Sequence, residues 1–170
     1  GCAHVVGGAP SGCVCQGLRN VCEFVGGVPR RAVFDNATEV GRRVGDRVLV
    51  SDLFRLFAAH YGLDYSFTNP RSGNEKGNVE NKVGCHRRNL FVPVPSFHDV
   101  GAFNARLLDS SLALSDGKTH YRRGIPELDL FEEDGAALSP MPEEGFSCVR
   151  WSTRRASKQG VVTVGGPHRY

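Results

Sequence analysis

Helical and strand periodicities alternate along residues 17–90, and this alternation limits the possible folds more than any other feature of the sequence. Apolar residues recur every three or four positions in some stretches and every second position in others, which is typical of helices and half-buried strands respectively. The pattern predicts a helix over 17–25, a strand over 31–35, a helix over 52–61, a strand over 63–67 and a helix over 79–90. This order predicts an α/β fold.

The remaining stretches give weaker signals. Residues 38–50 contain three arginines and two glycines, which favours a solvated, basic connection. Helical periodicity returns over 99–114 and again over 123–133. Two short strands are predicted over 146–152 and 159–164 because glycine residues there indicate turns. The polar stretch 71–78 reads as a loop or the entry to a helix.

Length and composition exclude several classes of protein. With 170 residues, 40% hydrophobic and 23% charged, the chain can build a domain with a core and is not a disordered segment. No apolar run reaches the roughly 18 residues of a membrane helix, and no secretory signal pattern is visible, so we expect a cytoplasmic protein with reduced thiols and no membrane partner. The net charge of +3 permits DNA as a partner without requiring it.

Cysteines near the N-terminus raise the alternative of a metal site. Cys13, Cys15 and Cys22 lie downstream of His4, but the C-x-C spacing differs from the C-x-x-C of zinc knuckles and no second half follows. We therefore favour core or incidental thiols over zinc.

Two carboxylates stand where catalytic chemistry is possible. Asp35 ends an apolar strand, and ligands gather at the carboxyl ends of strands in open α/β sheets. Glu80 lies beside the apolar stripe of the 79–90 helix, and carboxylates from separate elements are what Mg²⁺ requires. The basic residues near Glu80, suited to phosphate contacts, are Lys76, Lys82, Arg87 and Arg88. The alternative is that Asp35 is a turn residue and that Glu80 offsets a helix dipole.

Three sequence blocks resemble IstA-type insertion-sequence transposases. They are FVGGVPRRAVFDNAT at 24–38, NPRSGNEKGNVENKV at 69–83 and HRRNLFVPVP at 86–95. The resemblance implies a retroviral-integrase-like, RNase H-like core that cuts and joins DNA with an Asp-Asp-Glu triad. It further implies an irregular leader over 1–15 outside the family fold, a partial catalytic core over 16–92, a helical connector over 93–145 and a truncated small β-barrel over 146–170.

By motif position, Asp35 resembles the second carboxylate of the family and Glu80 the third, within its G-N-V-E block. Glu75 is an alternative candidate for the third carboxylate, but it falls outside the G-N-V-E pattern. Asn36 and Asn81 follow the two carboxylates and are expected to orient them. The resemblance also implies two Mg²⁺ or Mn²⁺ ions, DNA element ends and target DNA as substrates, a homo-oligomer and a partner ATPase.

The first carboxylate of the triad has no counterpart here. Asp35 is the first aspartate of the chain, and Glu23 is the only acid before it. We therefore expect a fragment of a transposase, an enzyme by family, that is inactive alone. Two alternatives are a non-catalytic DNA-binding remnant, supported by the basic segments 42–47 and 82–88, and a decayed gene product without function.

Overall fold

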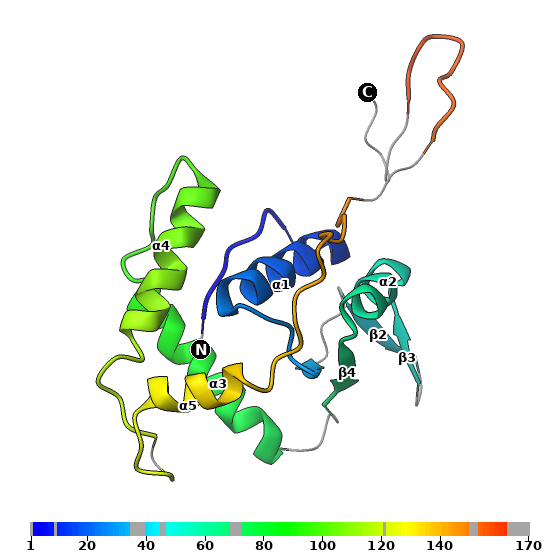
Figure 1. The fold of residues 1–170 in the computed structure, drawn as a ribbon. Helices are drawn as coiled ribbons and strands as arrows, with labels where there is room; N and C mark the ends of the chain where they lie inside the picture. Colours follow the sequence, from blue (N-terminus) through cyan, green and yellow to red (C-terminus); the bar gives the residue numbers. More distant parts are fainter. Residues whose placement is uncertain are drawn as a thin grey trace.

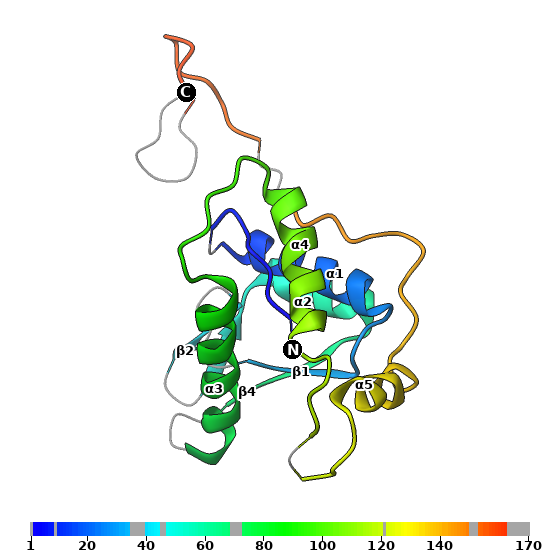
Figure 2. The ribbon, with the colours of Figure 1, turned by 90° about the vertical axis from the view of Figure 1, so that its left-hand side faces the viewer.

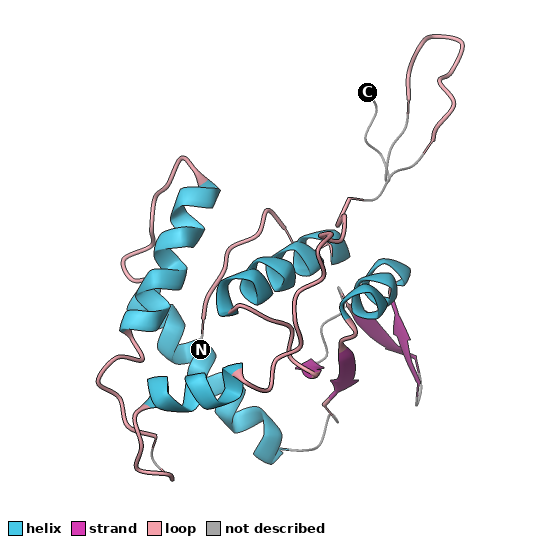
Figure 3. Cartoon of the chain, viewed as in Figure 1, coloured by secondary structure: helices cyan, strands magenta, loops and turns pink. Residues whose placement is uncertain are grey.

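The structure of the chain is a computed structural model, and Figure 1 shows the course of the ribbon. It describes residues 2–8, 10–34, 40–44, 47–68, 73–120, 122–149 and 153–162, with the side chains of 42–44, 73–80 and 82 outside the description. The described part contains more helix than strand, and the strands gather on one side of it (Figure 3).

Two capped helices lie on one side of the parallel strands, as Figure 2 shows. Helix α1 (Ser11–Val25) ends at Gly26, whose φ of 82° suits glycine because no Cβ opposes it. Helix α2 (Asp52–Tyr61) starts after Ser51, whose hydroxyl accepts a hydrogen bond from the Phe54 amide at 3.3 Å. The two helices pack against each other.

The described strands form two pairs. β1 (Arg31–Phe34) and β4 (Asp64–Phe67) run parallel, with Phe34 opposite Phe67. Between them the chain forms the antiparallel hairpin of β2 (Gly41–Val44) and β3 (Arg47–Val50) and then α2. A long crossover of this kind is what parallel neighbours require, since a tight turn cannot join them.

An aromatic core joins α2 to the parallel strands. Phe54 has no exposed surface, and its ring lies 5.2 Å from those of Phe34 and Tyr65. Phe57 continues the cluster at 6.1 Å from Phe54. Cys15 brings α1 into the same core. Burial, with a smaller contribution from neighbouring Cys148, raises the pKa of the Cys15 thiol to about 12.

Three further helices lie beside this unit. They are α3 (Gly73–Leu90), α4 (Val100–Ala113) and α5 (Glu127–Gly135). Asp99 caps α4 by accepting a hydrogen bond from the Ala102 amide at 3.1 Å, and α3 contacts α4. None of the helices in the described ranges combines the length and apolar character of a membrane-spanning segment.

The N-terminal residues contact α4, and the segment around Phe146 contacts α2. The residue 3 and residue 5 amides donate to Ser111 and Asn104 of α4 at 3.2 and 2.7 Å. Near the other end, the Phe146 amide donates to the Tyr61 hydroxyl at 3.2 Å, and the Phe146 ring lies 5.6 Å from Phe57. Beyond this contact, residues 153–162 extend away from the helices (Figure 1).

The predicted mixed α/β class is confirmed, with several corrections to individual elements. Helix α1 begins at Ser11, so residues 11–15 are helical where an irregular leader was expected. The expected basic connection over 38–50 contains the hairpin β2–β3. The predicted strands over 146–152 and 159–164 are not strands at residues 146–149 and 159–162, the parts that the structure describes. The RNase H-like topology stays a prediction.

A histidine between α1 and α4 makes this packing sensitive to acid. The Nε2 atom of His4 accepts from the side-chain amides of Asn20 at 2.9 Å and Asn104 at 3.2 Å. The orientation of Asn104 is fixed because its amide donates to the Val5 carbonyl and its carbonyl accepts from the Val5 amide. Burial lowers the pKa of His4, so the neutral ring is the form that folding favours.

We expect the free energy of unfolding to fall as the pH drops below about 6.5, the usual histidine pKa. The unfolded chain then binds a proton that the folded chain resists, so stability is present above this pH and lost below it. His4→Phe removes the titrating group. Its melting temperature should change less between pH 7.5 and pH 5.5 than that of the wild type, as thermal unfolding monitored by circular dichroism would show; parallel curves would contradict this role.

Candidate metal and DNA site

The carboxyl ends of β1 and β4 lie side by side. The Thr68 amide, directly after β4, donates to the Phe34 carbonyl at 2.9 Å and so extends the parallel pairing to the last residue of β1. Asp35 is the next residue in the chain and lies outside the described residues. The location of the Asp35 carboxylate at this edge stays a prediction.

The position of this edge depends on the aromatic core. Ala32 and Phe34 of β1 and Tyr65 and Phe67 of β4 pack against the buried cluster under α1 and α2. Val33, on the other face of β1, is 61% exposed. This alternation is expected of strands with one buried face, and it fixes the strand register that precedes Asp35.

Helix α3 carries the second predicted carboxylate. It begins at Gly73, a few residues after β4, and it includes position 80. The backbone places Glu80 in the first half of the helix, but its side chain lies outside the description, as do those of Lys76 and Lys82. The convergence of Asp35 and Glu80 on one ion therefore stays a prediction.

The C-terminal half of α3 presents basic side chains to solvent. Arg87 and Arg88 are both exposed and lie in the last turn, where a positive charge complements the helix dipole. The guanidinium of Arg88 folds back over Gly84, with Nη1 3.3 Å from the place that a Cβ on Gly84 would occupy. Since Gly84 and Arg88 are four residues apart, they are neighbours on the helix surface, and the Arg88 side chain runs back along α3 toward its N-terminal half.

The other predicted positions have mixed outcomes. Asn81 is exposed on α3, next to Glu80, and Asn36 lies outside the described residues. Val83 is 43% exposed, so it does not belong to the buried stripe that the spacing of Val79 and Val83 indicated.

The zinc alternative gains no support within the described residues. Cys15 and Cys22 are buried as core thiols, which confirms that expectation for these two residues. In the described part of the chain, no group of three or more His, Cys, Asp or Glu side chains is placed to hold a metal ion.

The sequence reasoning overlooked two residues at this site. Thr68 is a buried polar residue at the carboxyl edge beside Phe34. The feature of the sequence that could have indicated Thr68 is its position directly after the predicted strand over 63–67. Gly84 has no side chain, which leaves room for the Arg88 guanidinium to lie along α3. The spacing of four residues between Gly84 and both Glu80 and Arg88 was visible in the sequence.

Comparison with known proteins shows similarity to transposases. Over 149 residues the chain is 30% identical to the transposase for insertion sequences IS1326/IS1353 of Pseudomonas aeruginosa, and the same values hold for that of Shigella flexneri. A transposase of Aminobacter aminovorans is 35% identical over 127 residues. These alignments cover 82%, 82% and 71% of the chain respectively. No protein-family model matches the chain.

The alignments cover 28%, 28% and 25% of these three relatives, so the chain spans about a quarter of their length. The chain is therefore similar to part of an insertion-sequence transposase.

Proposed function

We propose that the chain is part of an IstA-type transposase, whose RNase H-like core cleaves DNA at element ends and joins it to target DNA. The observation that carries this proposal is the parallel pairing that extends to Phe34 and Thr68, directly before Asp35. Helix α3, with Glu80, follows β4 after a short connection. The similarity to transposases along most of the chain supports the same function.

The donor set fits a hard divalent cation, Mg²⁺ or Mn²⁺, of which we propose two in the complete protein. Asp35 and Glu80 offer carboxylate oxygens from separate elements, which are the ligands that such cations prefer. When bound, the ions activate the attacking oxygen and stabilise the leaving one. Asn81, exposed on α3 beside Glu80, and Asn36 would orient the carboxylates through hydrogen bonds.

The basic residues of α3 would hold the DNA backbone. Lys76, Lys82, Arg87 and Arg88 occur within one helix, and the two arginines are exposed at its end. Cations on the helix that carries Glu80 would position a phosphodiester without reading its sequence. A homo-oligomer and a partner ATPase belong to the same proposal, as does the cytoplasm as the place of action.

DNA affinity measured against salt tests the proposal. We expect the chain to bind duplex DNA with an affinity that falls as salt rises. Replacing Arg87 and Arg88 by glutamine should reduce the slope of log affinity against log salt by about two, because each lost phosphate contact removes about 0.9. Fluorescence anisotropy with a labelled duplex measures this, and Arg106→Gln on α4 is the matched control. Affinity without salt dependence would contradict the proposal.

The same assay distinguishes a metal-binding transposase site from a non-catalytic DNA-binding module. The exposed arginines of α3 are compatible with both. If Asp35 and Glu80 hold a divalent ion near the DNA, Ca²⁺ should increase the affinity of the wild type but not that of the Asp35→Asn/Glu80→Gln variant. Equal affinities for both proteins, with and without Ca²⁺, would favour the binding module.

A further inference from the structure

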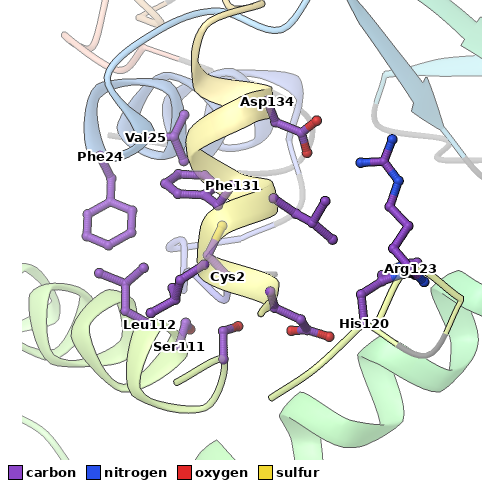
Figure 4. A pocket seen from close by; sticks show the side chains of 13 residues that line it. Cys2, Phe24, Val25, Ser111, Leu112, His120, Arg123, Phe131 and Asp134 are labelled. Atoms are coloured by element: carbon purple, nitrogen blue, oxygen red, sulfur yellow. Dashed lines mark hydrogen bonds between the residues drawn. The ribbon is translucent and has the colours of Figure 1, made fainter. Parts of the chain in front are cut away.

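A cavity of about 510 Å³ lies between the C-terminal ends of α1 and α4 and the helix α5 (Figure 4). Its size falls in the range of about 300–1,000 Å³ that is typical of binding pockets. Phe24 and Val25 come from α1, Leu112 from α4 and Phe131 from α5, and Figure 4 shows these side chains around one space. The cavity therefore has walls from three elements that are distant in the sequence.

Two of these apolar side chains remain open to solvent. Leu112 and Phe131 are each 40% exposed, and α5 has no buried residue. Exposed aromatic and aliphatic side chains around a cavity are typical of protein interfaces. A partner that inserts its own apolar side chains into the cavity would bury them.

The charges around the cavity favour a basic partner. Helix α5 carries five carboxylates and no basic residue, in a chain whose net charge is +3. Glu127 and Asp134 line the cavity, and Arg123, which also lines it, forms an ion pair with Glu133 at 3.0 Å. A surface of this kind attracts cationic groups and repels DNA, so it is distinct from the basic side of α3.

We propose that this cavity is the docking site of a basic, amphipathic helical segment of a partner protein. Apolar side chains at i, i+3, i+4 and i+7 of that segment would fill the space between Leu112 and Phe131, as amphipathic helices fill grooves in other complexes. Its lysine or arginine residues would face the carboxylates of α5. This docking is independent of the proposed DNA chemistry.

Two matched peptides test the proposal. Both are short, fluorescein-labelled helices with leucine at i, i+3, i+4 and i+7, and the other positions are lysine in one and glutamate in the other. We expect the lysine peptide to bind the 170-residue chain saturably in fluorescence anisotropy, less tightly at high salt, and the glutamate peptide not to bind. Absence of saturation, or equal binding of both peptides, would overturn the proposal.

Variants locate the binding. Phe131→Ser and Leu112→Ser should each lower the affinity for the lysine peptide by about tenfold or more. Leu56→Ser is the control, because Leu56 is 59% exposed on α2 and does not line the cavity. An independent readout is the set of amide chemical shifts: the peptide should move those of residues 24, 112 and 131. Unchanged affinity in both cavity variants, or shifts confined to other residues, would also overturn the proposal.

Discussion

Replacing Phe54 by alanine should lower the free energy of unfolding by about 3–5 kcal/mol, the range measured for buried phenylalanine. Phe54 is fully buried, and its ring lies 5.2 Å from Phe34, 5.2 Å from Tyr65 and 6.1 Å from Phe57. Truncation would leave a cavity between α2 and both parallel strands. Since single domains are stable by only about 5–15 kcal/mol, this is a large fraction of the total.

Urea denaturation followed by circular dichroism measures this loss. Leu56→Ala is a matched control on the same helix, because Leu56 is 59% exposed and surface substitutions change stability by about 0.5 kcal/mol or less. If Phe54→Ala lowered the free energy of unfolding by no more than Leu56→Ala, the packing of α2 against β1 and β4 would not depend on the aromatic cluster.

The second large effect concerns catalysis. We expect the purified 170-residue chain to give no strand-transfer product with labelled element ends and target DNA, in Mg²⁺ or Mn²⁺. A two-metal site loses nearly all of its transition-state stabilisation when a ligand is absent. Glu23, the only acid before Asp35, lies on α1 and forms an ion pair with Arg19 at 2.7 Å. Under the proposed function, Asp35 and Glu80 would be two of the three carboxylates that the resemblance implies, and the third would be missing.

Gel electrophoresis of the labelled ends detects any product, with a full-length transposase acting on its own ends as the positive control. A joined product that requires the metal and disappears in Asp35→Asn would show that the chain is active with the carboxylates it has, and would contradict this expectation.

Local signals were sufficient for several elements. Ser51 and Gly62 mark the ends of α2 through a cap and a left-handed glycine, and Gly26 ends α1 in the same way. The alternation of apolar and polar residues indicated β4 correctly. These features depend on a few neighbouring residues, which is why the sequence alone was informative.

Elements that depend on distant contacts were missed. Phe146 joins the core only because the segment after α5 meets α2, where its ring lies 5.6 Å from that of Phe57. The hairpin β2–β3 was hidden because its arginines and glycines resemble a solvated connection. Its strands are set by cross-strand pairing, for example Arg42 with Leu49.

For the candidate site too, features set by local sequence were predictable and those set by distant contacts were not. The strand before Asp35 and the helix that carries Glu80, Arg87 and Arg88 were readable from the sequence. The parallel partner of β1 was not, because nothing local identifies β4 as its neighbour. The cavity under α5 had no sequence signal at all, since Phe24, Leu112 and Phe131 are brought together only by tertiary packing.

The claim that Asp35 and Glu80 share divalent ions is tested most directly by the broadening of amide signals with Mn²⁺, which decreases steeply with distance from the ion. In the wild type, we expect broadening of Phe34, Thr68 and the residues around position 80, with much less at Arg31 and Asp64, at the opposite end of the strand pair. Asp35→Asn/Glu80→Gln should abolish it, whereas Asp64→Asn, an exposed carboxylate at that opposite end, should not. Broadening that leaves one of the two regions sharp, or that persists in the double variant, would contradict a shared metal site.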